Sequence, residues 1–235
     1  MIYITGDTHG DIDYKKLLIL KEKNLSYADY LIICGDAGIC WSIETLQYHL
    51  YLYRNIGCTI IFIDGNHENF EMLNRFPLVE YLGALMHQID KHIFHVLRGE
   101  IMILDNKTFL CIGGAISLDK IYRTPHVSWW PEEEITFHDI DNALNNLQAT
   151  NNKVDYVVTH CIDTPTVTKY FNFRRDICTD QLNFVDRIVE YKHWYFGHYH
   201  FDRKLNDKKT CLYQSIVEIS AMFVLLFQTL GVFIK

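Results

Sequence analysis

Hydrophobic residues gather in short, nearly continuous runs, and each run ends at a glycine, aspartate, asparagine or histidine. The five clearest runs are MIYIT (1–5), YLIIC (30–34), TIIFID (59–64), DYVVT (155–159) and HWYF (193–196). Runs without polar alternation are typical of strands that are buried on both faces. Further strands, some of them antiparallel, are predicted at residues 92–97, 101–104, 108–113 and 204–219.

Helical patterns fill the intervals between these runs. The predicted helices cover residues 13–23, 42–55, 136–149 and 179–190. Thr136 followed by Asp139 resembles a capping box at the start of the third helix. Strands that alternate with helices indicate an α/β fold, and the extra strands favour a mixed two-sheet sandwich flanked by helices. Because no repeat or linker interrupts the pattern, residues 1–219 are predicted to form one domain, followed by a hydrophobic extension at 220–235.

Composition and charge narrow the classes of function. The chain has 235 residues, of which 49% are hydrophobic, so it can form a full core and is not a disordered protein. Its formal net charge of −7 argues against a broad nucleic-acid-binding face, and stable binding of duplex DNA is not expected. That charge is compatible with a small site in which metal ions supply the positive charge.

The cysteines bear on the cellular compartment. There are seven of them, an odd number, and none forms a CxxC pair. Several lie in apolar runs that predict strands, which favours reduced thiols and a cytoplasmic protein. The first apolar run is too short for a signal sequence and predicts a first strand.

Metal-binding side chains collect where the predicted strands end. The five exits carry Asp7 and His9, then Asp36, then Asn66 and His67, then His160, and finally His198 and His200. Ligands of α/β proteins bind outside the carboxyl ends of strands, and imidazole and oxygen donors suit Zn, Mn or Fe. A glycine precedes most of these groups, which lets the backbone turn sharply out of the sheet.

Each exit taken alone has a simpler explanation. A Gly-Asp pair after a strand is usually a turn, and a single histidine there is more often a hydrogen-bonded structural residue. His198 and His200 are two residues apart, a spacing that points both side chains to one side of an extended segment. The ordered set of five exits, rather than any one of them, favours a metal site.

Together these motifs resemble the calcineurin-like metallophosphoesterase superfamily. The matching segments are GDTHG (6–10), GDAG (35–38), GNHE (65–68), TH (159–160) and GHYH (197–200). The resemblance spans residues 1 to about 219. The stretch WWPEE (129–133) and the segment LYQSIVEI (212–219) are similar to small bacterial and phage members of that superfamily.

The resemblance implies a four-layer αββα sandwich and a binuclear centre of two divalent metal ions, with Mn, Fe or Zn as candidates. One ion would be held by Asp7, His9 and His200, and the other by Asn66, His160 and His198. Asp36 would bridge both ions. A hydroxide between the ions would attack phosphorus, and His67 would protonate the departing alkoxide as the general acid. A hydrogen-bonding role behind the ligands is the alternative for His67.

One motif departs from a known branch of the superfamily. In protein serine/threonine phosphatases the second motif reads GDxVDRG, whereas here it reads GDAGICW. The Asp that orients the acid histidine and the Arg that binds phosphate are therefore absent from this motif, which disfavours protein phosphatase activity. The phosphate-binding candidates are Arg98 and Arg123, followed by Arg174 and Arg175; for each of them a solvated surface position is the alternative.

Two segments are not explained by the metal site. The pair Trp129-Trp130 could stack a base or form a pocket wall, but packing against the core is the favoured interpretation. Residues 132–134 are predicted to be the acidic start of the following helix. Residues 219–234 are almost entirely apolar, yet sixteen residues are short for a membrane span. Packing or an oligomer contact is favoured for that tail, with membrane contact second and a lineage-specific or accidental extension third.

These observations predict a metal-dependent phosphoesterase that hydrolyses phosphomonoesters or phosphodiesters. A small phosphorylated molecule, with a nucleotide among the candidates, is the expected substrate. The alternative is a non-catalytic scaffold that uses the same fold to bind other proteins. A scaffold tends to lose ligands, whereas this chain keeps all seven together with His67.

Overall fold

The apolar runs of the sequence form the centres of two β-sheets in the computed structural model, which describes residues 1–219. The first sheet contains β1 (Ile2–Thr5), β2 (Tyr30–Ile33), β3 (Thr59–Phe62), β4 (Leu78–Tyr81), β5 (Ala84–Asp90), β6 (Ile93–Val96) and β13 (Ile216–Ile219). The second contains β7 (Glu100–Leu104), β8 (Lys107–Ile112), β9 (Tyr156–Thr159), β10 (His193–Phe196), β11 (Arg203–Lys204) and β12 (Lys209–Cys211).

Both sheets are mixed, as predicted. The strand orders are β13-β1-β2-β3-β6-β5-β4 and β11-β12-β10-β9-β8-β7. In the first sheet β1, β2, β3 and β6 run parallel, while β13, β5 and β4 are antiparallel to their neighbours. In the second sheet β8, β9, β10 and β12 run parallel, and β7 and β11 are antiparallel. The strands that carry the predicted ligands are therefore central parallel strands.

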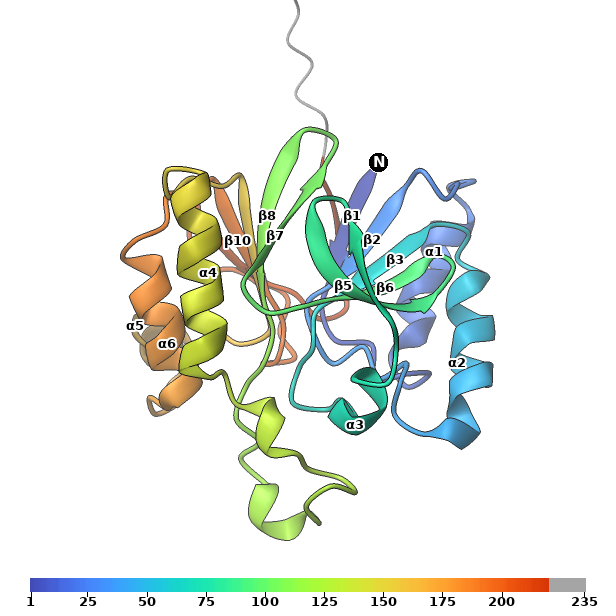
Figure 1. Ribbon diagram of the computed structural model, residues 1–235, viewed down its shortest axis with the longest axis horizontal. Coiled ribbons are helices and arrows are strands. Elements are labelled where there is room, and N and C mark those ends of the chain that lie inside the picture. Colours follow the sequence, from blue (N-terminus) through green and yellow to red (C-terminus); the bar gives the residue numbers. More distant parts are fainter. Residues whose placement is uncertain (220–235) are drawn as a thin grey trace, which may run out of the picture.

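Helices cover the two outer faces of the paired sheets. The described chain contains α1 (Leu18–Lys21), α2 (Ile43–Arg54), α3 (Phe70–Leu73), α4 (Phe137–Ala149), α5 (Thr164–Phe171) and α6 (Ile177–Asp186), of which α3 lies at the end of the sandwich (Figure 1). In Figure 1, α1 and α2 lie outside the first sheet, and α4, α5 and α6 lie outside the second. This arrangement is the four-layer αββα sandwich that the resemblance implies.

Three hydrophobic clusters separate the four layers. Alternation along β1 shows how one strand serves two of them: Ile2 and Ile4 face the other sheet, whereas Tyr3 faces the helices. The third cluster lies between the second sheet and α4 to α6, with Trp194 of β10 buried in it. All seven cysteines are free and buried, in agreement with the prediction of reduced thiols.

Two helices begin where the sequence predicted them, and two others differ from their predicted ranges. Ser42 caps α2, and Thr136 forms a capping box with Asp139 at the start of α4. The predicted helix at 13–23 is a 3₁₀ turn at Tyr14–Leu17 followed by the single turn of α1. The helix predicted at 179–190 is α6. It begins earlier than predicted because Asp176 caps it, and it also ends earlier, at Asp186. The sequence did not predict α3, α5 or the β4–β5 hairpin.

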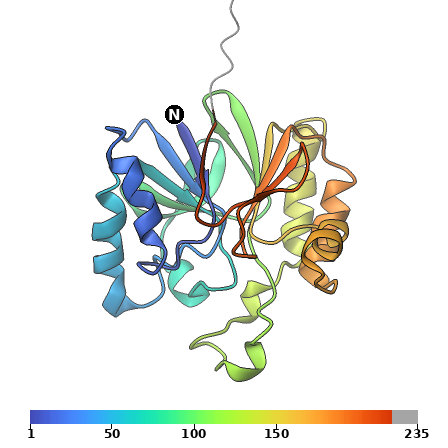
Figure 2. The ribbon, with the colours of Figure 1, turned by 180° about the vertical axis from the view of Figure 1, so that it is seen from behind.

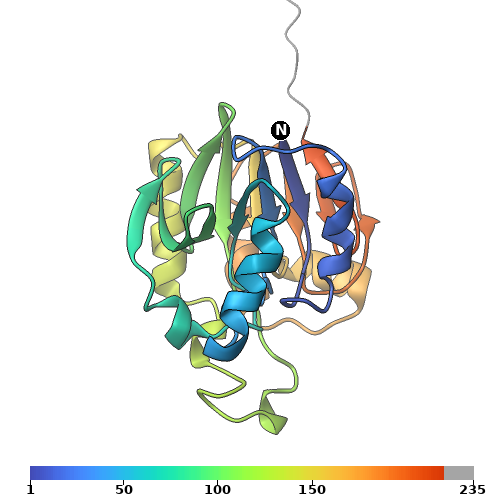
Figure 3. The same ribbon diagram turned by 90° about the vertical axis from the view of Figure 1, so that its right-hand side faces the viewer.

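The segment between β8 and α4 extends from the sandwich past α3 (Figures 1 and 3). It contains 3₁₀ turns at Lys120–Tyr122 and Pro131–Glu133. Its acidic residues were expected to open a helix, but that prediction is wrong, because the second of these turns ends before α4 begins. Glu133 is fully buried and accepts a hydrogen bond from Ser117. Trp130 is also buried and meets Trp41 edge to face, so this member of the Trp129-Trp130 pair packs into the core as favoured, whereas Trp129 is half-buried.

The ends of the described chain are neighbours. Ile2 of β1 pairs with Ile219 of β13, the last described residue (Figure 2). The hydrophobic extension at 220–235, with its predicted packing, oligomer or membrane contact, lies outside the described residues. Within residues 1–219, none of the helices has the length and hydrophobicity needed to cross a bilayer.

Candidate metal centre

The strand exits of the two sheets meet at one point. Nε2 of His9, which follows β1, is 3.4 Å from Oδ2 of Asp36, which follows β2. The same Asp36 oxygen is 3.3 Å from Nε2 of His160, which follows β9 in the other sheet. Nε2 of His160 is also 3.1 Å from Oδ1 of Asn66, which follows β3. Side chains that follow four strands of two sheets are thus brought together at one edge of the sandwich.

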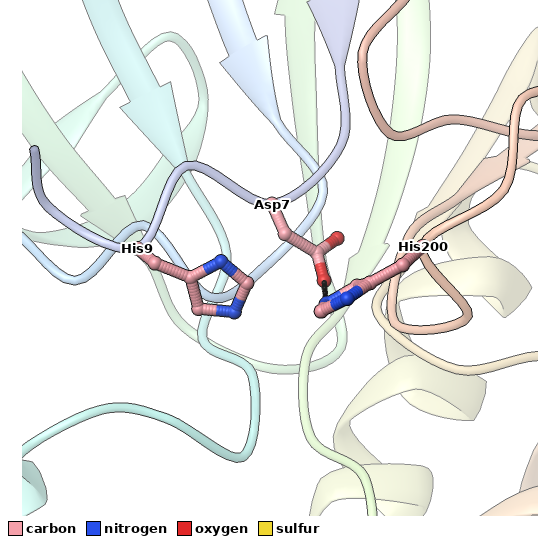
Figure 4. A group of neighbouring side chains, drawn as sticks. All are labelled: Asp7, His9 and His200. Carbon is pink, nitrogen blue, oxygen red and sulfur yellow. Dashed lines mark ion pairs between the residues drawn. The ribbon is translucent and has the colours of Figure 1, made fainter. Parts of the chain in front are cut away.

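The second histidine motif completes the cluster. Nε2 of His200 is 3.2 Å from Oδ2 of Asp7, and the ring centroids of His200 and His9 are 5.2 Å apart (Figure 4). The backbone N–H of His198 donates to Asp7, and the centroid of the His198 ring lies 4.9 Å from that of His160. All seven predicted ligands therefore lie around one centre.

Two groups of ligand atoms are close enough to hold an ion. Asp7, His9 and His200 form one group, in which all the ligand atoms lie within 4.8 Å of one another. The other group contains Asp7, Asp36 and His160, whose ligand atoms also lie within 4.8 Å of one another. The first group matches one predicted ligand set. The second group combines Asp7, predicted for one ion, with His160, predicted for the other, and with Asp36, the predicted bridge.

The hydrogen bonds of two histidines favour metal binding. Nδ1 of His9 is 2.8 Å from Oδ2 of Asp13, and Nδ1 of His160 is 2.8 Å from the carbonyl oxygen of Cys34. Both partners accept hydrogen bonds, so each Nδ1 carries a proton and each Nε2 is the nitrogen left for a metal. In metalloproteins, a hydrogen-bond acceptor on the ring nitrogen that does not bind the metal orients the histidine in this way. The donor chemistry therefore fits a divalent ion.

The backbone around the centre adopts conformations that most residues avoid. His9, Asp36, His198 and His200 have φ values of 42°, 49°, 69° and 51°. Such left-handed conformations of non-glycine residues cost energy and concentrate at functional sites. The glycines are equally constrained: a Cβ on Gly65 would clash with the Asp36 carboxylate. The absence of a side chain at Gly65 therefore lets its backbone lie close to the Asp36 carboxylate.

The charges of the centre also fit a cation. Burial alone would raise the pKa of Asp36, but His160 and His9 hold that pKa well below its ordinary value. Burial disfavours charge on those two imidazoles, yet the Asp36 carboxylate raises the pKa of each to about 9. Burial, together with His160, lowers the pKa of His198 to about 3, which leaves that ring neutral. The buried carboxylate therefore attracts positive charge, which a metal ion can supply in place of protons on the imidazoles.

His67 lies at the edge of the centre beside an arginine. Its backbone N–H donates to Oδ1 of Asp36 at 2.7 Å, and its ring centroid is 5.6 Å from that of His9. Nη2 of Arg123 is 3.0 Å from Nε2 of His67. Burial lowers the pKa of His67, Asp36 opposes that change, and Arg123 adds to it. The structure thus places one predicted phosphate-binding arginine against the predicted acid.

The other predicted substrate residue, Arg98, has a different environment. Its Nε is 2.9 Å from Oδ2 of Asp64, and its Nη1 is 2.8 Å from the carbonyl oxygen of Glu134 and 3.2 Å from Asp139. The side chain is 9% exposed. Because these contacts occupy the guanidinium, Arg98 serves the fold, and the prediction that it contacts substrate is disfavoured.

The two remaining arginine candidates lie on the surface. Arg174 and Arg175 are both exposed, in the segment between α5 and α6. Nη2 of Arg175 is 2.6 Å from Oδ2 of Asp180, so its charge is already paired. Both arginines therefore occupy solvated surface positions, which was the alternative to phosphate binding.

Several residues that support the ligands were missed by sequence analysis. Tyr213 donates to Asp13 at 2.9 Å and stacks flat on His200, with 4.5 Å between ring centroids. Asp13 stands four positions after His9, and a second acid so close to the first motif was a usable signal. Tyr213 lies in a different part of the chain, and no local pattern marks it.

A second supporting chain fixes the amide of Asn66. Its Nδ2 donates to Ser117 at 3.1 Å, and Ser117 donates to the buried Glu133. This arrangement turns Oδ1 of Asn66 toward His160, which is the orientation that a ligand needs. Glu68 ties the motif loops together, because its carboxylate accepts from the N–H of Ala37 at 2.7 Å.

Comparisons with known proteins agree with these observations. A family model described as calcineurin-like phosphoesterase matches residues 1–202, a range that includes every predicted ligand. No curated protein matches the chain.

Three solved structures resemble the chain at low sequence identity. TT1561 of Thermus thermophilus is 10% identical, with a TM-score of 0.47, over 91% of this chain and 89% of that chain. A phosphopantetheinyl hydrolase from Mycobacterium tuberculosis is 15% identical, with a TM-score of 0.42, over 90% and 87%. AQ665 from Aquifex aeolicus, a protein of unknown function, is 16% identical, with a TM-score of 0.37, over 81% and 87%.

Proposed function

Since this chain belongs to the calcineurin-like phosphoesterase family, we propose that it is a dinuclear metal-dependent hydrolase of a small phosphorylated substrate. One observation carries the proposal most strongly. Oδ2 of Asp36 lies 3.4 Å from Nε2 of His9 and 3.3 Å from Nε2 of His160, between the two predicted ligand sets. That is the position a bridging carboxylate needs.

The ligands divide between the two sheets and the two ions. Asp7, His9 and His200 would hold one ion, and Asn66, His160 and His198 the other, with Asp36 shared. When bound, two divalent ions supply positive charge that attracts a phosphoryl group and activates water for attack on phosphorus. Asp13 and the Cys34 carbonyl keep the Nε2 atoms of His9 and His160 directed at the centre.

His67 would give its proton to the departing alkoxide. In the structure Nε2 of His67 faces Nη2 of Arg123, which can only donate, so this nitrogen carries no proton here. A phosphate anion near the centre would attract the Arg123 guanidinium and free Nε2 of His67 to carry a proton. Arg123 therefore has two tasks, binding the phosphoryl group and releasing the acid.

The net charge and the intact ligand set shape the substrate class. An overall charge of −7 disfavours long nucleic acids as substrates. The proposed substrate is therefore a small phosphorylated molecule, such as a nucleotide. The proposed compartment is the cytoplasm. A non-catalytic scaffold is the weaker alternative, because all seven ligands and His67 lie around one centre.

A hydrolysis screen tests the proposal. Purified protein reconstituted with Mn, Zn, Fe or Ni is assayed with p-nitrophenyl phosphate, bis-p-nitrophenyl phosphate, and linear and cyclic nucleotides. We expect hydrolysis that depends on metal and is absent in Asp36→Asn. The ratio of monoester to diester rates assigns the substrate class. Protein that binds two ions and hydrolyses nothing in the panel would contradict a broad phosphoesterase activity, and protein that binds none would favour the scaffold.

A further inference from the structure

A cavity of about 280 Å³ opens directly beside the candidate metal centre. Its lining includes His9 and His67 together with Ile12, Trp41 and Thr45. The last three do not belong to the predicted ligand set. The cavity therefore adjoins the centre through His9 and His67, and the rest of its lining comes from residues outside the ligand set.

The wall formed by Trp41 is held in place by other contacts. Its ring meets the buried Trp130 edge to face, with 5.7 Å between centroids. Nδ2 of Asn69 donates to the Trp41 carbonyl oxygen at 2.9 Å. Thr45 stands in the first turn of α2, where its N–H donates to the capping Ser42. The cavity is thus preformed rather than dependent on a loop movement.

The position of the cavity indicates which part of a substrate enters it. A general acid must lie within hydrogen-bonding reach of the oxygen that departs. If His67 is that acid, the organic group on the departing oxygen extends into the space next to His67. Among the cavities lined by described residues, this one includes both His67 and the ligand His9.

The charge of the cavity disfavours a second phosphate. Its described lining contains no lysine or arginine, and the half-exposed Asp11 contributes a carboxylate. The imidazole of His49 also lines the cavity, but its Nε2 already lies 3.7 Å from Oδ1 of Asp11. A negative group on the departing alcohol would be repelled by Asp11 and would lack a free cationic partner. The lining therefore favours a neutral group.

The size and the lining favour a ring. Liquid water takes about 30 Å³ per molecule, so the cavity has room for roughly nine water-sized heavy atoms. That matches a substituted aromatic ring. A flat aromatic group also gains from contact with the indole of Trp41 and the side chain of Ile12.

We propose that this cavity binds the departing alcohol of the substrate, and that this alcohol carries a neutral aromatic ring. The inference rests on the proposed function and narrows it. In the reaction, the P–O bond to the ring-bearing alkoxide breaks and a water oxygen joins phosphorus. The departing oxygen receives its proton from His67.

Binding of two non-hydrolysable phosphonates tests the inference. Benzylphosphonate and ethylphosphonate are titrated calorimetrically into the Mn-loaded protein. Wild type should bind benzylphosphonate at least tenfold more tightly, because its ring fills the cavity. Thr45→Trp fills the cavity from within and should reduce that preference at least fivefold. Tyr51→Trp introduces the same side chain at an exposed position of α2 outside the cavity and should leave the preference unchanged.

The outcomes separate the two proposals. Equal affinity of the two phosphonates for wild type, or an unchanged preference in Thr45→Trp, would overturn the ring-binding inference while leaving hydrolysis of other esters intact. A clear preference for benzylphosphonate without hydrolysis of benzyl phosphate would support the ligand class of the cavity and count against the proposed reaction.

Discussion

Nη2 of Arg123 lies 3.0 Å from Nε2 of His67, on the nitrogen that an acid catalyst would use. Arg123 comes from the segment between β8 and α4, whereas His67 follows β3. A guanidinium always donates, so the contact requires a neutral His67. In the proposed mechanism, this pair would link phosphate binding by Arg123 to protonation of the departing group by His67.

Replacing Arg123 with Gln should weaken substrate binding. Loss of a charge-assisted hydrogen bond is worth about 1.5–3 kcal/mol, so kcat/KM should fall about 10- to 150-fold, mainly through KM. Steady-state kinetics with p-nitrophenyl phosphate measures this change. Arg175→Gln, at an exposed arginine paired with Asp180, is the control. Equal KM values in wild type and Arg123→Gln would rule out the binding role.

His67→Ala should slow the reaction without releasing metal. The contact of His67 with Asp36 is made by the backbone N–H, which alanine retains. Loss of an acid costs about 10²- to 10⁴-fold for ethyl phosphate, whose alkoxide leaves poorly. For p-nitrophenyl phosphate, whose leaving group needs little protonation, we expect less than about a tenfold loss. An equal loss for both substrates would show that His67 is not the acid.

Tyr213 should support metal affinity through two contacts. Tyr213→Phe removes the hydrogen bond to Asp13, which orients His9, but keeps the stacking on His200. Metal affinity should fall about tenfold in Tyr213→Phe and further in Tyr213→Leu, which loses both contacts. Titration with Mn²⁺ monitored by electron paramagnetic resonance measures the affinities. Tyr48→Phe, at an exposed position, is the control, and unchanged affinity in both Tyr213 variants would contradict the role.

Acid should weaken the fold through His87. Burial, together with His95 at 3.0 Å, lowers the pKa of His87 from 6.5 to about 4. Because the folded-state pKa is the lower one, the stabilisation by neutral His87 is complete above pH 6.5 and is lost as the pH falls toward 4. At pH 5 the loss is roughly 1–2 kcal/mol.

Urea unfolding at pH 7.5 and pH 5 tests this prediction. The free energy of unfolding of wild type relative to His87→Phe should fall by roughly 1–2 kcal/mol between the two pH values. His138→Phe, at an exposed histidine of α4, should show no such change relative to wild type. A pH-independent difference between wild type and His87→Phe would contradict the assignment.

The parts of the fold that sequence predicts are those with local signals. Unbroken apolar runs located β1, β2, β3, β9 and β10 and the side chains at their exits, and a glycine follows each of these runs except that of β9. Thr136 and Asp139 marked a helix start in the same way, because a capping box is made of local hydrogen bonds. The helix at 13–23 was overestimated because its spacing of leucines does not distinguish a 3₁₀ turn from an α-helix.

The contacts that sequence could not predict join distant residues. Tyr213 and Asp13 are 200 positions apart, and Arg123 and His67 are 56 apart. Arg98 and Arg123 are equally charged in the sequence, and only their surroundings distinguish them: Arg98 is bound to Asp64, and Arg123 reaches His67. Tertiary packing, not residue type, decided which arginine faces the centre.

The metal content of wild type and Asp36→Asn tests the central claim most directly. After reconstitution with Mn²⁺ and removal of free ions, mass spectrometry should find two ions per chain in wild type, with the magnetic coupling of a close pair in the paramagnetic resonance spectrum. Asp36→Asn should hold one ion or none and should lack hydrolytic activity. A wild type with a single uncoupled ion, or an Asp36→Asn variant with two ions and full activity, would contradict the dinuclear centre.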